Sequence, residues 1–250
     1  MNLHYHHFGV GEPMVFLHGL FGSADNWLTL GKRLADRYAV YLVDQRNHGR
    51  SPHRDGHDYD SLANDLKEWL DSENLIKVRL LGHSMGGKTA MRFAQLYPDY
   101  LQQVIVVDMG VKAYPPHHQE IVKGLQSLKL DEISSRREAE EALENYIPDF
   151  GTRQFLLKNL YRTDKKDFAW RMNIEALERN MDAILSALPK EPRVDRPTLF
   201  VSGSKSDYMN REDKDEISEI FNSVSFVELP TGHWVHAEDP DGLEKILRDL

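Results

Sequence analysis

Residues 82–87 read Gly82-His83-Ser84-Met85-Gly86-Gly87, between a short apolar run, Val78–Leu81, and a stretch with helical periodicity, Lys88–Tyr97. Gly-x-Ser-x-Gly between a strand and a helix is the pattern of a nucleophile elbow. The glycines are needed because side chains two positions before and after the serine would collide in so tight a turn. The serine then projects from the carboxyl edge of a sheet, and the helix N-terminus behind it favours developing negative charge. The stretch predicts an α/β fold with Ser84 as its nucleophile.

Further short apolar runs, bounded by Gly, Asp or Pro, recur on both sides of this stretch. They are rich in β-branched residues, which is typical of strands buried on both faces of a parallel sheet. Helical stretches separate them, so right-handed crossovers and a doubly wound, mostly parallel sheet are expected. The expected strands are Met14–Leu17, Ala39–Val43, Val78–Leu81, Val104–Val107, Thr198–Val201 and Val224–Leu229, and the expected helices are Trp27–Asp36, Ser61–Leu70, Lys88–Tyr97, Glu212–Phe221 and Glu238–Leu250.

The alternation of strands and helices stops at Gly110 and resumes at Pro197. The pattern between them is helical, and proline clusters bracket it on either side. The sequence therefore predicts a core formed by residues 1–110 and 191–250, interrupted by an all-helical cap at residues 111–190. The expected cap helices are His117–Leu130, Arg136–Ile147, Arg153–Tyr161 and Ile174–Leu188, and the second of them should be capped by Ser135.

The composition narrows the classes of function. The 250 residues include no cysteine, which excludes disulfides, thiolate metal sites and a cysteine nucleophile. A formal net charge of -9 argues against a nucleic-acid partner. No apolar run approaches the roughly 18 residues of a membrane-spanning helix, so no membrane partner is expected. Because no secretory signal is visible at the N-terminus, we expect a cytoplasmic protein, either a monomer or a small homo-oligomer.

A second glycine-containing loop, His18-Gly19-Leu20-Phe21-Gly22-Ser23, follows the expected strand Met14–Leu17. Glycine there lets the backbone bend so that a main-chain N–H points at the same place as Ser84. Acyl transfer requires such donors because the tetrahedral intermediate concentrates charge on one oxygen. We expect the backbone N–H groups of Leu20 and Met85 to form this oxyanion hole. His18 itself is expected to form structural hydrogen bonds.

The candidate base is His233, in the loop Gly232-His233-Trp234-Val235-His236 after the last expected strand. A histidine this late in the chain fits the order serine, acid, histidine. His236 is the alternative base. Hydrophobic side chains near the catalytic positions are candidates for the wall of a substrate pocket, and so is one aromatic residue in the cap. These residues are Phe21, Tyr208, Trp234 and Phe155. Other histidines are treated as surface residues, so no metal site is expected; they are His4, His6, His7, His117 and His118.

Four motifs together carry a resemblance: HGLFGS (18–23), DQRNHGRS (44–51), GHSMGGK (82–88) and GHWVHAEDP (232–240). In this order they resemble the α/β-hydrolase superfamily, and within it the small esterases of the YbfF and ABHD eleven type. Cap segments at 153–160 and 170–173 also resemble that group. The resemblance implies a serine esterase or thioesterase that acts on small acyl esters or thioesters without a cofactor. The alternatives are a carbon–carbon bond hydrolase or lyase of the same fold, or a binding module with little turnover.

The acid of the triad is open between two aspartates. In the commonest pattern of the superfamily an Asp lies three residues after the glycine that ends the strand Thr198–Val201. Here that position is Ser206, and Asp207 follows it. Asp108 ends the strand Val104–Val107, at the other edge from which an acid can reach the histidine. The resembling esterases carry a serine and an Asp at these two positions, which favours Asp108, with Ser206 as an auxiliary hydrogen bonder near His233. Asp207 is the alternative acid, or else the N-cap of the following helix.

Overall fold

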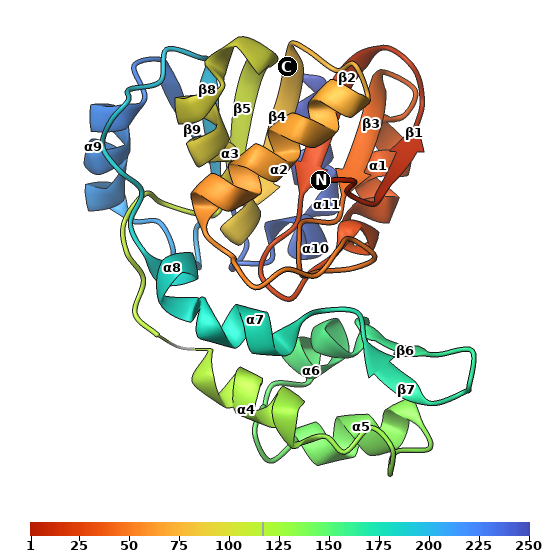
Figure 1. Cartoon of the computed structure of the whole chain (residues 1–250). Helices are drawn as coiled ribbons and strands as arrows, with labels where there is room; N and C mark the ends of the chain where they lie inside the picture. Colours follow the sequence, from red (N-terminus) through yellow and green to blue (C-terminus); the bar gives the residue numbers. More distant parts are fainter. Residues whose placement is uncertain (117) are drawn as a thin grey trace.

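One seven-stranded sheet forms the centre of the molecule in the computed structural model of the chain, in which residues 1–116 and 118–250 are described. The strand order is β1-β3-β2-β4-β5-β8-β9; β1 pairs antiparallel with β3, and the other pairs are parallel. This confirms the predicted mostly parallel sheet (Figure 1). The strands are β1 (Tyr5–Phe8), β2 (Glu12–Leu17), β3 (Tyr38–Val43), β4 (Val78–His83), β5 (Leu101–Val107), β8 (Thr198–Gly203) and β9 (Val224–Leu229).

Helices cover both faces of the sheet because successive strand residues point to opposite sides. In β2, Val15 and Leu17 pack in the cluster that includes α2, α3 and α9, whereas Met14 and Phe16 pack in the cluster of α1 and α11. Figure 1 shows α2 and α3 in front of the sheet and α11 behind it. The helices of the core are η1 (Ala24–Trp27), α1 (Leu28–Leu34), α2 (Tyr59–Ser72), α3 (Met85–Leu96), η2 (Pro98–Tyr100), α9 (Arg211–Ile220), α10 (Val235–Glu238) and α11 (Pro240–Arg248).

The segment between β5 and β8 lies beyond the carboxyl edge of the sheet, where the loops after β2, β4 and β5 also end (Figure 1). We call residues 111–190 the inserted segment. Ser135 is the N-cap of α5, as predicted, and its side chain accepts from the Glu138 N–H. The elements of this segment are α4 (Gln119–Ser127), α5 (Arg136–Leu143), α6 (Phe150–Leu157), β6 (Leu160–Arg162), β7 (Phe168–Trp170), α7 (Ile174–Arg179) and α8 (Met181–Leu185).

The prediction of an all-helical segment is wrong at its centre. The expected helix Arg153–Tyr161 ends at Leu157, and β6 pairs antiparallel with β7 across a polar turn, in which the Thr163 N–H donates to the Asp167 carbonyl (2.8 Å). A turn of charged residues between two short runs that contain aromatic residues favours a hairpin over a helix. The expected helix Ile174–Leu188 divides into α7 and α8 at Asn180, whose φ of -104° departs from helical geometry. The helix expected from His117 begins at Gln119; residue 117 lies outside the described residues.

A buried lysine holds the two connections of the inserted segment together. The Lys88 ammonium, on the first turn of α3, donates to the carbonyls of Lys112 (2.7 Å) and Ser186. It also lies 4.9 Å from the centre of the Tyr114 ring. Burial lowers the pKa of Lys88 to about 7, because water no longer stabilises the charged form.

In the described part of the chain, no helix combines the length and apolar composition needed to cross a membrane.

Candidate active site

Ser84 occupies the tight turn that its flanking glycines predict. Its backbone angles are φ 54° and ψ -121°, a conformation that residues with side chains rarely adopt. A Cβ at Gly82 would lie 2.0 Å from the Gly86 carbonyl oxygen, and one at Gly86 would lie 2.6 Å from two carbonyl oxygens at the end of β2. Both positions therefore require glycine, and the turn places the Ser84 side chain at the carboxyl edge of the sheet, before the first turn of α3.

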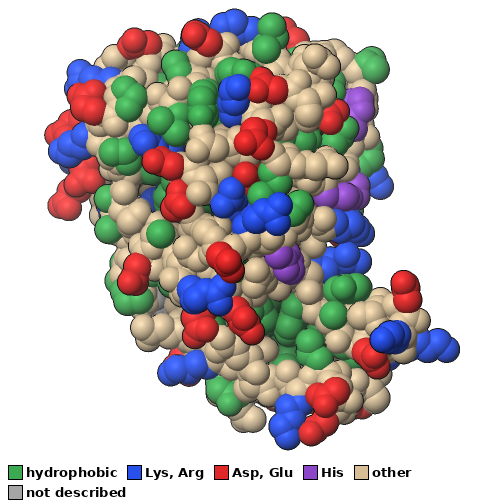
Figure 2. Space-filling view, in the orientation of Figure 1, with side chains coloured by type: hydrophobic (Ala, Val, Ile, Leu, Met, Phe, Trp, Pro, Cys, Tyr) green, Lys and Arg blue, Asp and Glu red, His purple; other side chains and the backbone are tan. Residues whose placement is uncertain are grey.

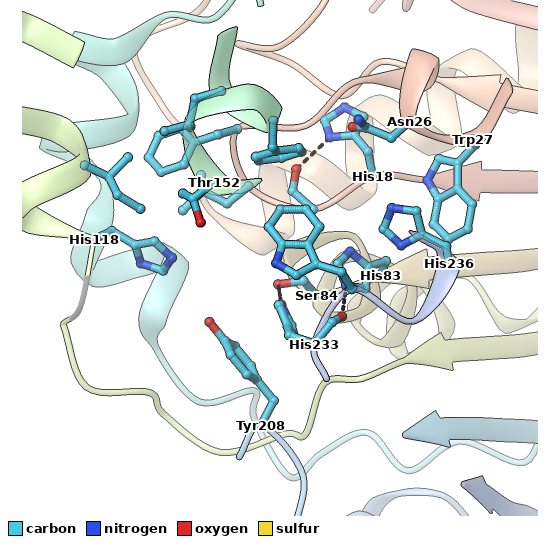
Figure 3. Close-up of a pocket in the computed structure, with 17 residues that line it drawn as sticks. His18, Asn26, Trp27, His83, Ser84, His118, Thr152, Tyr208, His233 and His236 are labelled. Carbon is cyan, nitrogen blue, oxygen red and sulfur yellow. Dashed lines mark hydrogen bonds between the residues drawn. The ribbon is translucent and has the colours of Figure 1, made fainter. Parts of the chain in front are cut away.

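The structure brings Ser84, His233 and Asp108 together. In the sequence, Ser84 lies 149 positions from His233, and Asp108 lies 125 positions from it. The His233 Nε2 atom lies 3.1 Å from the Ser84 hydroxyl, and its Nδ1 atom lies 2.7 Å from Asp108 Oδ2. Because a carboxylate only accepts, Nδ1 carries the proton and Nε2 is left to accept from the serine. Figure 3 shows the Ser84 and His233 side chains facing each other. This arrangement can remove the serine proton and hold the resulting imidazolium.

Asp108 is fully buried, and donors from several elements surround its carboxylate. The Gly203 N–H donates to Oδ1 (2.9 Å), and the Ser206 hydroxyl donates to Oδ2, the same oxygen that faces His233. Ser206 therefore lies where the sequence places an auxiliary hydrogen bonder. Asp207 is exposed. Its expected role as a helix N-cap is wrong, because Asn210 caps α9 and its side chain accepts from the Asp213 N–H.

The alternative base, His236, lies on the far side of His83 from the serine. Its ring packs against Trp27 (4.5 Å between ring centres) and His83 (4.8 Å), as Figure 3 shows. Burial, together with the nearby imidazole of His233, lowers the pKa of His236 to about 4. The Ser84 hydroxyl donates to His233 instead.

The two expected oxyanion donors belong to segments that both lie next to Ser84. Met85 begins α3, and Leu20 is in the loop after β2, where a Cβ at Gly19 would lie 3.2 Å from Ser84 Cβ. In the loops and turns of the described residues, neither of these two N–H groups donates to a backbone carbonyl. For Met85 this is expected, because the first amides of a helix lack an intrahelical acceptor. The structure thus places both segments next to Ser84, and the oxyanion hole itself stays a prediction.

His83 is a site residue that the sequence reasoning did not single out. Its Nε2–H donates to the carbonyl oxygen of His233 (2.8 Å), and the two rings lie 4.7 Å apart. Burial lowers the pKa of His83 well below the usual value, so the ring stays neutral. The signal was its position directly before the serine, from which the side chain reaches the histidine loop across the sheet edge.

A cavity of about 250 Å³ opens in front of Ser84 between the core and the inserted segment. All four predicted pocket residues line it: Phe21, Phe155, Tyr208 and Trp234. Tyr208 stacks on His233 with 3.7 Å between ring centres, and Phe155 meets Trp234 edge to face at 4.3 Å. Figure 2 shows hydrophobic side chains in the hollow between the two parts of the molecule. Lining residues not predicted include Trp27, His118, Ile121, Thr152 and Leu156.

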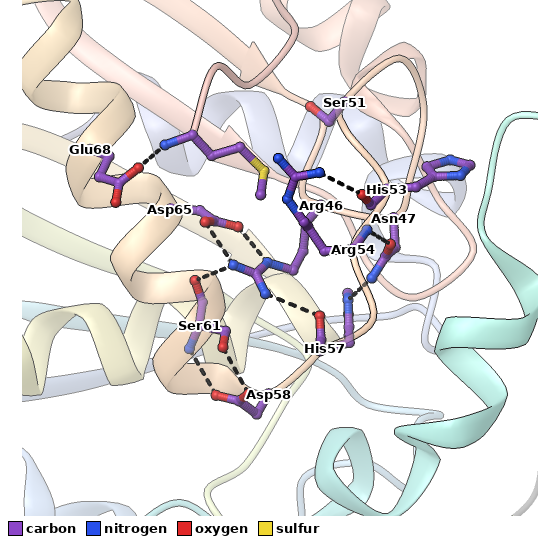
Figure 4. Close-up of polar contacts among 12 residues, drawn as sticks. Arg46, Asn47, Ser51, His53, Arg54, His57, Asp58, Ser61, Asp65 and Glu68 are labelled. Carbon is purple, nitrogen blue, oxygen red and sulfur yellow. Dashed lines mark hydrogen bonds and ion pairs between the residues drawn. The ribbon is translucent and has the colours of Figure 1, made fainter.

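The motif at residues 44–51 forms a hydrogen-bonded loop beside the site (Figure 4). Arg46 and Asp65 form a bidentate ion pair with a contact of 2.7 Å, and a Cβ at Gly49 would collide with the Asp44 carboxylate. His18 has the expected structural role: its Nδ1–H donates to the Gly19 carbonyl (2.8 Å), and its Nε2 accepts from the Gln45 N–H (3.0 Å). In the described residues, no group of three or more His, Asp or Glu side chains could hold a metal ion.

Comparison with known proteins identifies similar sequences along most of the chain. A family model described as alpha/beta hydrolase fold matches residues 12–240. A putative esterase/lipase of Haemophilus influenzae is 37% identical over 230 residues, which cover 91% of this chain and 79% of that protein. Esterase YbfF of Escherichia coli is 33% identical over 95% of this chain and 92% of its own. The sn-1-specific diacylglycerol lipase ABHD11 of Danio rerio is 34% identical over 93% of this chain and 76% of its own.

Solved structures give the same picture. A marine microorganism esterase superposes with a TM-score of 0.96 at 40% identity, and the match covers 99% of this chain and 98% of that one. An E-2-(acetamidomethylene)succinate hydrolase has a TM-score of 0.78 at 21% identity, over 99% of this chain and 94% of its own, which supports the fold alone.

Proposed function

Since the chain belongs to the α/β-hydrolase fold family and is a carboxylic ester hydrolase, we propose that it cleaves small acyl esters and thioesters through a Ser84-His233-Asp108 triad and an acyl-enzyme. The observation that carries this proposal is the continuous chain of contacts from the Ser84 hydroxyl through both ring nitrogens of His233 to the buried Asp108 carboxylate.

In the first half of the reaction, His233 Nε2 takes the Ser84 proton while the serine oxygen attacks the substrate carbonyl. The carbonyl oxygen becomes an oxyanion, which accepts from the Leu20 and Met85 N–H groups. Asp108 keeps the Nδ1–H of His233 in place and stabilises the imidazolium. When the tetrahedral intermediate collapses, the bond to the leaving oxygen or sulfur breaks, and His233 Nε2–H protonates that atom.

In the second half, water takes the place of the serine as nucleophile. His233 removes its proton, the hydroxide attacks the acyl carbonyl, and the Ser84 oxygen leaves and regains a proton. The aromatic and aliphatic walls of the cavity are suited to the acyl group. We assign residues 111–190 as a cap over residues 1–110 and 191–250, because α4 and α6 contribute Ile121 and Phe155 to this cavity. The cap would limit the length of the acyl chain and exclude bulk water.

Replacement of the nucleophile tests the whole proposal. Ser84→Ala should abolish hydrolysis of p-nitrophenyl esters and labelling by a fluorophosphonate, because no oxygen remains to form the acyl or phosphonyl bond. Wild-type enzyme assayed on p-nitrophenyl esters and acyl-CoA thioesters of graded chain length identifies the preferred substrate. Retention of activity or labelling by Ser84→Ala would contradict the assignment. Thermal unfolding of the variant controls for loss of structure.

A further inference from the structure

The loop that carries the Leu20 N–H is a tight turn, closed by a hydrogen bond from the Gly22 N–H to the Gly19 carbonyl (3.0 Å). Phe21, the next residue, has a φ of 59°, in the left-handed region that costs a residue with a side chain roughly 1–2 kcal/mol. Glycines at positions 19 and 22 leave the rest of the loop flexible in the unfolded chain. The strained conformation of Phe21 therefore gains from contacts outside the loop, and these help to hold the expected oxyanion donor in place.

Both backbone groups of Phe21 are held by side chains from other segments. The Phe21 N–H donates to His48 Nε2 (3.1 Å), and the Phe21 carbonyl accepts from Asn159 Nδ2 (2.7 Å). The first contact fixes the peptide plane shared with Leu20, and the second fixes the following plane. Together they determine the path of the chain directly after the Leu20 N–H.

Asn159 belongs to the inserted segment, between α6 and β6, and is itself rigidly held. Its side chain is buried and also donates to the Leu156 carbonyl (3.2 Å). The backbone carbonyl of Asn159 accepts from the Arg171 N–H (2.9 Å). The residue lies 138 positions from Phe21 in sequence. The hydrogen bond to Phe21 can therefore form only when the inserted segment is packed on the core.

The second support of Phe21 is also braced by the inserted segment. The Nδ1–H of His48 donates to the Arg46 carbonyl (3.0 Å), which leaves Nε2 as the acceptor for Phe21. Asn47, the neighbour of His48, accepts from the Asn173 N–H through its backbone carbonyl (2.9 Å). Figure 4 shows the Asn47 side chain bonded to the His57 ring and to the Arg54 N–H.

We propose that Asn159 is a positioning residue that orients the Leu20 N–H toward the oxyanion, so that the inserted segment completes the oxyanion hole. The inference rests on the proposed function. It makes the segment part of the catalytic machinery as well as a wall of the cavity. Displacement of the segment would release the Phe21 carbonyl and loosen a donor whose full loss typically costs about 10²–10³ in rate.

Asn159→Leu, which is similar in size but cannot donate, tests the proposal. On p-nitrophenyl butyrate, kcat should fall by about tenfold or more while KM changes less than about twofold, because the donor is used fully only in the transition state. The affinity for a trifluoromethyl ketone, which forms a tetrahedral oxyanion on Ser84, should fall by the same factor as kcat/KM. The matched control is Asn180→Leu, which removes another amide from the inserted segment, one bonded to the Asp55 carbonyl (2.7 Å). This control should retain wild-type kcat.

Asn159→Asp provides a second readout and serves if the leucine variant does not fold. A carboxylate cannot donate to the Phe21 carbonyl, whereas a protonated carboxyl can. The ratio of variant to wild-type kcat should therefore rise as the pH falls from 8 to about 5.5. A flat ratio, or a leucine variant that changes only KM or thermal stability, would overturn the proposal. Wild-type enzyme that neither hydrolyses esters nor reacts with a fluorophosphonate would instead refute the proposed function.

Discussion

At the scale of single residues, the burial of Asp108 explains how a carboxylate can orient His233. Water cannot compete for its oxygens, which accept from the Gly203 N–H, the Ser206 hydroxyl and the His233 ring. An exposed carboxylate such as that of Asp207 would exchange its partners with solvent. The Ser206 hydroxyl donates to the Asp108 carboxylate, which follows the neighbouring strand β5.

Exchange of each aspartate for asparagine separates the two candidate acids. In Asp108→Asn, an amide N–H can face His233 and favour the wrong tautomer, so kcat should fall by about 10⁴. Asp207→Asn should change kcat by less than about twofold. Steady-state kinetics on one p-nitrophenyl ester measure both variants, and circular dichroism checks their folding. Equal losses, or a larger loss at position 207, would assign the acid to Asp207.

At the scale of elements, the inserted segment is fastened at both of its ends by one side chain. The Lys88 ammonium on α3 donates to carbonyls next to the start and the end of the segment, at Lys112 and Ser186. The Leu188 N–H also donates to the Val111 carbonyl (2.9 Å), which joins the two connections directly. The helix that begins next to Ser84 therefore also holds the inserted segment in place.

The lowered pKa of Lys88 predicts a specific dependence of stability on pH. The unfolded lysine binds a proton up to its ordinary pKa near 10.5, but the folded one only up to about 7. Between these values the unfolded state holds more protons, so the free energy of unfolding should rise with pH, by at most about 1.4 kcal/mol per pH unit from this group. Urea unfolding from pH 7 to 9 should show this slope in wild type and lose it in Lys88→Met. The exposed Lys165→Met is the control, and persistence of the slope in Lys88→Met would contradict the assignment.

At the scale of the whole molecule, buried neutral histidines lie between the sheet and the loops of its carboxyl edge. Burial lowers the pKa values of His18, His48, His57 and His83, and that of His57 reaches about 3. The rings of His18 and His48 lie 5.0 Å apart, and those of His48 and His57 lie 5.5 Å apart. The His48 ring accepts from the Phe21 N–H, and the His57 ring contacts the sulfur of Met85. These rings therefore contact both segments that are expected to supply the oxyanion donors.

These histidines should make the fold sensitive to mild acid. Below pH 6.5 these histidines bind protons in the unfolded chain but stay neutral in the folded chain. The free energy of unfolding should therefore decrease continuously toward pH 5, before most carboxylates titrate. For His57 the window extends from pH 6.5 to about 3. Urea unfolding at pH 7.5, 6 and 5 measures the decrease, and His57→Gln should make it shallower. A variant as acid-sensitive as wild type would show that His57 does not contribute.

The oligomeric state and the cytoplasmic location stay predictions.

The sequence by itself determined the mostly parallel sheet and the tight turn at Ser84, because both depend on local features: short β-branched runs, and glycines that the turn requires at positions 82 and 86. The family resemblance favoured Asp108 over Asp207, but only the tertiary structure shows the Asp108 carboxylate against His233, since both aspartates follow strands and differ in what packs around them. The hairpin β6–β7 and the contact of Asn159 with Phe21 likewise depend on partners distant in the chain. A hydrogen bond between two remote segments leaves no periodic pattern in the sequence of either segment. Such contacts are therefore seen only once the inserted segment is packed on the core.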